Sequence, residues 1–266
     1  DVYKRQRQFC ESLAWNLLFR WFLGMTMDEP GFVQSSFSKN RERLLEHQVA
    51  ERFFSEVLKQ AKAERLLSEE HFTVDGTLIE SLASLKSVRR KDDNDGGPID
   101  PDNQGVDFHG ERRSNATHAS VTDPDAKLFR KSRAAATKLY FSGNAVAENR
   151  CGLIVDFSVD DVLTGERAAA LRQLTRRKLR NIKTLAGDKG YCTKDFVAEL
   201  RRRGIAPHIA FIADGRRIPG LDQRTMRHAS YHLSQRKRKL IEQAFGWLKT
   251  VAGLRKSRFF GRARTE

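Results

Sequence analysis

The sequence predicts an α/β fold with a mixed β-sheet, preceded by a small all-helical domain. Apolar residues recur at helical spacing through residues 7–68. From residue 69 onward, short stretches rich in β-branched and aromatic residues alternate with helical patterns. No apolar run approaches the roughly 18 residues that a membrane-spanning helix needs, so we expect no association with a membrane.

The composition favours a polyanionic partner and a reducing compartment. The 266 residues carry a formal net charge of +15, and the isoelectric point is near 10.0. Such a chain is typical of nucleic-acid-binding proteins, and a ribosome-associated or merely basic protein is the alternative. The cysteines are far apart and odd in number, which indicates free thiols and argues against a disulfide frame or a zinc site; they are Cys10, Cys151 and Cys192.

Two apolar-periodic stretches predict the helices of the first domain, residues 7–68. "FCESLAWNLLFRWFLGM" has apolar residues at helical spacing. Its part "LAWNLLFRWFLGM" is the most apolar segment of the chain, and we predict a buried helix there although Arg20 interrupts it. "VAERFFSEVLKQAKAERLL" predicts a second amphipathic helix. The Pro-Gly pair in "DEPGFVQSS" marks a break between them.

The second domain, residues 69–266, is predicted as strand, long loop, paired strands, helix, strand, helix, strand, loop and helix. The long loop covers residues 86–116, which are rich in Gly, Pro, Asp and Arg without apolar periodicity, and we expect it to be disordered. The paired strands are expected to turn at residues 149–152. The segments behind the other elements are, in order, "HFTVDGTLIES", "TKLYFSGNAVAEN", "GLIVDFSVD", "GERAAALRQLTRRKLRNIK", "TLAGDKGY", "TKDFVAELRRRG" (capped by Thr193 and closed by Gly204), "APHIAFIA", the polar "DGRRIPGLDQRTMRHASYH" and "SQRKRKLIEQAFGWLKTVAG".

Two aspartates lie where a sheet could present them to a ligand. Asp75, in "TVDGT", can point away from the face on which Val74 packs, and Gly76 lets another backbone or a substrate come close. Asp188, in "LAGDKGY", lies at the carboxyl end of a strand, where ligands gather in open α/β sheets, and the neighbouring Lys189 would offset its charge. The alternatives are a strand-end aspartate that caps a turn and an ordinary loop aspartate, and the pattern does not decide between them.

Glu242 is the third candidate acid. On the last predicted helix it shares a face with Arg238, four residues before it, and Lys249, seven residues after it. The helix pattern alone favours a solvated ion pair with Arg238, worth about 0.3–0.5 kcal/mol, over a metal ligand. The neighbouring apolar face, expected to pack on the sheet, comprises Leu240, Ile241, Ala244, Phe245 and Leu248.

The other motifs examined are weaker. The histidines show no metal-ligand spacing, and no GxSxG, Walker or GxGxxG pattern occurs. "DDNDGGPIDPD" lacks the terminal Glu of a calcium loop, which favours a solvated acidic loop.

Several segments in order resemble one known family. They are "RQFCESLAWNLLFRWFLGMTMDEPGFVQSSFSKNRERL", "HASVTDPDAKLFRK", "GNAVAENRCGLIVDFSV", "TLAGDKGYCTKDFVAELRRRGIAPHIA" and "RHASYHLSQRKRKLIEQAFGWLKTVAGLRKSRFFG". Together they cover nearly the whole chain and resemble the insertion-sequence DDE transposases of the IS-five type. The resemblance implies a ribonuclease-H-like catalytic domain behind a helical N-terminal domain.

The resemblance also implies the catalytic residues. Asp75, Asp188 and Glu242 match the Asp, Asp and Glu of the family's triad, which would hold two Mg²⁺ or Mn²⁺ ions for cleavage of DNA and strand transfer. The family's signature on the last helix is matched by Arg238, Glu242 and Lys249, whereas Gln235 stands where the family has Tyr.

The implied partner is DNA, as terminal inverted repeats and as target. Arg238 and Lys249 would contact phosphates beside the scissile bond, and Lys189, Arg236 and Lys237 would extend that track, although a solvated helix face is the default interpretation of each basic cluster. The resemblance further implies a homodimer in the active complex and a bacterial cytoplasmic protein that associates with the nucleoid when it acts.

Both ends suggest a fragment. "DVYKRQ", residues 1–6, resembles translated adapter sequence, and family members continue beyond "FFGRARTE". Two other functions stay open: an inactive transposase remnant that only binds DNA, and another ribonuclease-H-like nuclease.

Overall fold

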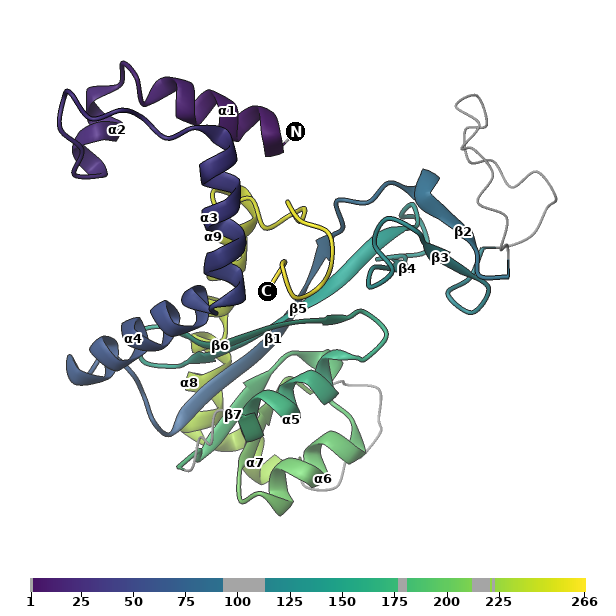
Figure 1. Ribbon diagram of the computed structural model, residues 1–266. Helices are drawn as coiled ribbons and strands as arrows, with labels where there is room; N and C mark the ends of the chain where they lie inside the picture. The colour runs from purple at the N-terminus through teal and green to yellow at the C-terminus, as the bar shows by residue number, and fades with distance from the viewer. Residues whose placement is uncertain (1, 93–112, 177–180, 212–220, 222) are drawn as a thin grey trace. The chain divides into compact units, whose positions relative to one another are not determined.

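The computed structural model describes residues 2–92, 113–176, 181–211, 221 and 223–266 (Figure 1). The chain forms two compact units, Asp1–Gln60 and Ala61–Glu266. The first contains the helices α1 (Val2–Ser12), α2 (Leu17–Phe22) and α3 (Gln34–Glu46) and most of α4 (Val49–Ala63). Helices are therefore present where the sequence predicts a helical domain.

The burial of α2 is opposite to the prediction. The segment forms a helix of only six residues, Leu17–Phe22, in which Trp21 and Phe22 are exposed and Arg20 is buried. The Arg20 guanidinium donates hydrogen bonds to the carbonyl oxygens of Leu13 (2.8 Å), Thr26 and Glu29. These bonds satisfy the buried charge by drawing the loop after α2 around it. The prediction of a buried apolar helix was wrong because these partners could not be inferred from helical periodicity.

The second unit is built on a mixed six-stranded sheet. Its order is β4-β5-β1-β7-β8, and β6 pairs with β5 beside β4. β1 pairs antiparallel with β5 and parallel with β7, and β7 pairs parallel with β8. This is the ribonuclease-H-like arrangement, so the predicted fold class is confirmed. The strands are β1 (His71–Glu80), β4 (Lys127–Phe129), β5 (Lys138–Glu148), β6 (Ile154–Asp161), β7 (Thr184–Gly187) and β8 (Ala206–Ile209).

Helices cover both faces of this sheet. α5 (Glu166–Arg176) and α6 (Lys194–Arg202) lie on one face, and α8 (Ala229–Lys237) and α9 (Lys239–Thr250) lie on the other (Figure 1). From α9, Ile241 and Phe245 are buried against Ala145 and Ala147 of β5. The apolar face predicted for the last helix therefore does pack on the sheet.

Three predicted segments differ in detail. The first part of the predicted disordered loop is ordered, because it contains most of η1 (Leu85–Ser87) and all of β2 (Val88–Arg90), and β2 pairs with β3 (His118–Ser120). Residues 93–112 lie outside the described residues. The predicted last helix is two helices, α8 and α9, that meet at Arg238. The second polar loop was predicted too long, since α7 (Gln223–Arg227) and the start of α8 lie within it.

Glu148 organises the predicted turn between β5 and β6. Its side chain is buried, and its two carboxylate oxygens accept hydrogen bonds from the backbone N–H groups of Ser68, Arg150, Cys151 and Leu153, at 2.7 to 3.1 Å. One carboxylate thus satisfies four backbone donors, and it ties the entry to β1 to this turn.

We predict that Glu148→Gln lowers the free energy of unfolding of the second unit by about 2–3 kcal/mol, because the amide NH₂ would face backbone donors. Native-state hydrogen exchange of the β1 and β5 amides measures this change. Glu56→Gln, at an exposed residue paired with Lys59, is the control and should change it by less than about 0.5 kcal/mol. Equal effects would contradict the role of Glu148.

A second prediction concerns His208 on β8. Burial of its ring, with the positive charges of His71, His228 and Arg201, lowers its pKa from 6.5 to about 4. The unfolded chain therefore binds a proton that the folded chain rejects, so stability falls as the pH drops from about 6.5 towards about 4. We expect His208→Gln to weaken this pH dependence of the melting temperature. The exposed His232→Gln should leave it unchanged, and identical profiles for both variants would refute the assignment.

Candidate active site

The register between β1 and β7 brings Asp75 and Asp188 together. Thr73 of β1 pairs with Ala186 of β7, and each aspartate follows two residues later on its own chain segment. Parallel strands in register keep such positions side by side. Across the antiparallel pairing, Asp75 lies opposite Ala145, whose side chain packs against α9. Asp75 therefore belongs to the face that α9 covers.

The surroundings of Asp75 disfavour its charge. Its Oδ1 accepts a hydrogen bond from the N–H of Gly76 (2.9 Å). Burial nevertheless raises the pKa of Asp75 to about 6; the bond from Gly76 lowers it, the charges of Asp188 and Glu166 raise it, and Arg238 lowers it. Negative charge is thus concentrated at this end of the sheet.

Asp188 directly follows β7 and thus lies at the carboxyl end of a strand, as the sequence predicted. It precedes the short 3₁₀ helix η2 (Lys189–Tyr191), and its Oδ1 accepts a hydrogen bond from the N–H of Gly190 (2.8 Å). Tyr191 is buried below this turn, and its pKa is raised by burial and by the charges of Glu166, Asp75 and Asp188. Tyr191 therefore neighbours all three acids.

Glu166 is a site residue that the sequence reasoning missed. It is the first residue of α5, and burial of its carboxyl together with the charge of Asp188 raises its pKa. A Cβ atom added to Gly76 would lie 2.5 Å from the Glu166 carboxyl carbon. The close approach that Gly76 was expected to permit is thus made by this carboxyl group. An acid in the first turn of a helix is common because it favours the helix dipole, so the pattern gave no reason to single it out.

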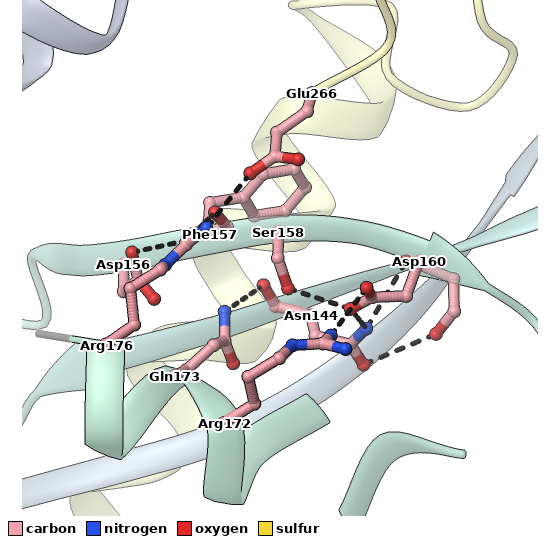
Figure 2. Close-up of polar contacts among 10 residues, drawn as sticks. Asn144, Asp156, Phe157, Ser158, Asp160, Arg172, Gln173, Arg176 and Glu266 are labelled. Atoms are coloured by element: carbon pink, nitrogen blue, oxygen red, sulfur yellow. Dashed lines mark hydrogen bonds and ion pairs between the residues drawn. The ribbon is translucent and has the colours of Figure 1, made fainter. Parts of the chain in front are cut away.

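A polar network holds α5 on the sheet (Figure 2). Arg172 pairs with Asp160 of β6 at 2.5 Å, and Arg176 pairs with Asp156 at 2.8 Å. Gln173 donates from Nε2 to the backbone oxygen of Asn144 (2.9 Å), the residue opposite Gly76 in the β1–β5 register. These contacts fix the helix whose first residue is Glu166.

Glu242 lies one turn along α9 from Arg238 and binds it. The Arg238 Nη1 and the Glu242 Oε1 are 2.6 Å apart, and the Glu242 side chain is half exposed. This is the ion pair that the helix spacing predicted. Across the described residues, no group of three or more His, Cys, Asp or Glu side chains is arranged to hold a metal ion. The charges of Asp75, Asp188 and Glu166 act on one another without forming such a group, and Glu242 is bound to Arg238.

Two of the five basic candidates lie near the aspartates. Arg238 is close enough to lower the pKa of Asp75, and its Nε is buried with no hydrogen-bond partner among the described residues. Lys249 is half-buried; burial and the charges of Lys131 and Arg255 lower its pKa, whereas Asp75 raises it. Both cations therefore lie beside the acidic cluster.

The other three basic candidates are placed differently. Lys189 and Arg236 are exposed. Lys237 donates a hydrogen bond from its Nζ to the backbone oxygen of Arg150 (3.1 Å), in the β5–β6 turn. The structure thus directs Lys237 towards this turn.

The donor chemistry of the acidic cluster suits hard divalent cations. Mg²⁺ and Mn²⁺ prefer carboxylate oxygens, and crowded carboxylates with raised pKa values lose their mutual repulsion when a cation lies between them. Asp75, Asp188 and Glu166 supply such oxygens, and the pKa values of Asp75 and Glu166 are raised. Glu242 is the residue that fits least directly, because Arg238 already neutralises it.

Comparison with protein families assigns the second unit. Residues 115–266, more than half of the chain, match the family described as "Transposase DDE domain". Asp188 and Glu242 lie inside the matched residues, and Asp75 precedes them. Comparison with the curated proteins and with the solved structures finds no match. Among the described residues, none of the helices has the length and apolarity required to cross a membrane. The fold, the paired aspartates and the family match agree, and the chain belongs to the transposases with a DDE domain.

Proposed function

We propose that this protein is the DNA transposase of an insertion sequence of the IS-five type, which cleaves DNA at the ends of the element and joins them to target DNA. The observation that carries this proposal is the juxtaposition of Asp75 and Asp188 at one end of a ribonuclease-H-like sheet, in a chain that matches the DDE family. The helical N-terminal unit and the catalytic unit would together form the functional protein.

Transposases with a DDE domain generally use divalent metal ions. In our proposal Asp75, Asp188 and Glu242 would hold two Mg²⁺ or Mn²⁺ ions, which when bound supply activation of a water and then of a 3′-hydroxyl for attack on phosphorus. Glu166 adds a fourth carboxylate beside the two aspartates. The chain's own task is to fix these carboxylates on strands and helix ends before DNA arrives.

Glu242 remains the third member of the proposed triad. Its helix, α9, packs on the face of the sheet to which Asp75 belongs, and Arg238 is a neighbour of both acids. An ion pair between residues four apart on a half-exposed helix face contributes only about 0.3–0.5 kcal/mol. A DNA phosphate can therefore compete for Arg238 and free the Glu242 carboxylate.

Arg238 and Lys249 have a direct role in this proposal. Each is partly buried beside Asp75, so a phosphodiester that enters the site would meet two cations with little competing water. Lys189 and Arg236, being exposed, are proposed as outer DNA contacts. Lys237 is proposed only as a more distant one, because its ammonium group binds the Arg150 carbonyl.

The inactive DNA-binding remnant is the second candidate. The observation that favours it is the ion pair of Glu242 with Arg238, which leaves no three acids in a metal-holding arrangement among the described residues. The two candidates differ in a nicking assay on supercoiled DNA with Mn²⁺, where only the transposase would cleave.

The proposed function also implies DNA partners, an oligomeric state and a cellular location. The DNA partners would be the terminal inverted repeats of the element and the target. A homodimer would form the active complex, and the exposed Trp15, Trp21 and Phe22 of the first unit provide apolar area for such an association. The protein would act in the bacterial cytoplasm, on the nucleoid.

We predict that Asp188→Asn lowers Mn²⁺-dependent nicking by about a thousandfold or more, because a metal carboxylate is lost. Asparagine retains the side-chain oxygen that accepts from the N–H of Gly190, so the turn is preserved. DNA binding, measured by fluorescence anisotropy, should be largely retained.

The matched control is Asp195→Asn, which removes the same charge from an exposed residue in the first turn of α6. It should nick as well as the unmodified protein. Retained nicking in the Asp188 variant would overturn the triad assignment.

Gly76→Ala tests the placement of Glu166. The new methyl group would take the space of the Glu166 carboxyl, which can swing away at little cost to stability because it is the end of a flexible side chain. We expect the Mn²⁺ concentration for half-maximal nicking to rise severalfold, because one negative charge leaves the cluster. The melting temperature should change little.

The Glu166→Ala background supplies the control. There the space is empty, so adding Gly76→Ala should have no further effect on the Mn²⁺ requirement. An equal additional effect in that background would show that Gly76 acts independently of Glu166.

A further inference from the structure

A groove of about 900 Å³ lies in the second unit, outside the acidic cluster. Its apolar lining includes Leu128 and Phe129 of β4. Its polar lining includes three arginines, Arg113, Arg130 and Arg133. We call this feature the arginine groove.

The three guanidinium groups carry unneutralised charge. In the described part of the chain, no carboxylate lies within ion-pair distance of any of them. Arg130 donates hydrogen bonds from Nε and Nη2 to Thr137 Oγ1, both at 3.3 Å, which orients the side chain without cancelling its charge. Like charges in one concave surface repel one another, and a polyanion would relieve that repulsion.

Two hydrogen bonds fix the backbone segments that line the groove. The Asn115 side chain donates from Nδ2 to the Leu128 carbonyl and accepts from the Leu128 N–H at Oδ1, both at 2.8 Å. This two-point contact joins the segment that carries Arg113 to β4, directly before Arg130. These two hydrogen bonds therefore hold the backbone near Arg113 and the backbone near Arg130 next to each other.

One residue of the same loop acts electrostatically on Lys249 of the candidate active site. Lys131 stands between Arg130 and Ser132, which both line the groove, and its charge acts on Lys249, which in turn lies near Asp75. The charges of Lys131 and Lys249 therefore act on one another, as do those of Lys249 and Asp75, and they form an electrostatic track from the groove lining. A ligand that follows this track must carry repeated negative charge over several side chains.

We propose that the arginine groove binds the sugar–phosphate backbone of duplex DNA that extends from the active site. The groove is too large for a single phosphate ion, and its charge complements successive phosphates. Duplex is favoured over single-stranded DNA because sites for single strands present exposed aromatic rings for base stacking, whereas Phe129 in the lining is half-buried and in T-shaped contact with Tyr140, with ring centroids 6.5 Å apart. This inference rests on the proposed function, since it assumes that DNA occupies the active site.

The test is DNA binding without metal. The variant Arg113→Gln, Arg130→Gln, Arg133→Gln would be compared with the unmodified protein in EDTA, using a fluorescein-labelled DNA duplex of arbitrary sequence over a series of salt concentrations. Loss of three phosphate contacts should lower the slope of log K against log salt by about 2 to 3. Affinity at low salt should fall on the order of tenfold or more.

The matched control removes the same net charge elsewhere. Lys59→Gln, Lys62→Gln, Lys183→Gln replaces three exposed lysines, each paired with a glutamate. It should keep the slope, because these lysines are already neutralised. Thermal melting checks that both triple variants fold; Arg113 is half-buried and the other five side chains are exposed.

The possible outcomes test DNA binding by the arginine groove separately from the proposed transposase activity. A reduced slope in the groove variant alone supports the inference, whatever the nicking activity of the protein. Equal slopes in the two variants would overturn it, as would unmodified protein that binds no DNA in EDTA. An effect on a matched RNA duplex with none on DNA would also overturn it. Nicking with Mn²⁺, read separately in the Asp188→Asn comparison, tests the proposed function.

Discussion

The parallel pairing of β1 with β7 is the constraint on which the site depends. It holds Thr73 beside Ala186, and the two aspartates follow at equal distances along their segments. β1 alone could not create the site, because β5 on its other edge places only Ala145 opposite Asp75. A shift of the β7 register by one residue would turn Asp188 to the other face. The pairing of the two aspartates therefore depends on both strands, because neither strand alone brings them together.

Bringing acids together is electrostatically unfavourable. The fold places cations near Asp75 on one face of the sheet and fixes the position of α5 by ion pairs on the other face. On one face, α9 and its neighbours place Arg238 and Lys249 near Asp75. On the other face, α5 carries Glu166 towards Gly76 and is held there by the ion pairs of Arg172 and Arg176 with β6. Those pairs lie at the border of the core, where a lost partner leaves a buried carboxylate unpaired. These ion pairs keep α5 on the sheet, so Glu166 stays close to the two aspartates.

The sequence predicted what local patterns determine. The β5–β6 hairpin, the strand that ends before Asp188 and the ion pair of Arg238 with Glu242 follow from strand and helix patterns, and all are present. Arg20 and Glu166 could not be predicted, because their surroundings come from chain segments that local patterns do not relate. The break at Arg238 between α8 and α9 was missed for the opposite reason: no Pro or Gly marks it, and local propensity alone favours one continuous helix.

Arg238 connects these observations. It stands at the break between two helices, binds Glu242 on one side and acts on Asp75 on the other, and its buried Nε has no partner among the described residues. A guanidinium has five N–H donors in a fixed plane, so one arginine can exchange a carboxylate for a phosphate without moving its backbone. In the proposed transposase, arrival of a DNA phosphate at Arg238 would release Glu242 towards the aspartates. Assembly of the triad would then depend on the substrate, and the repulsion of Glu242 with the two aspartates would arise only when DNA is present.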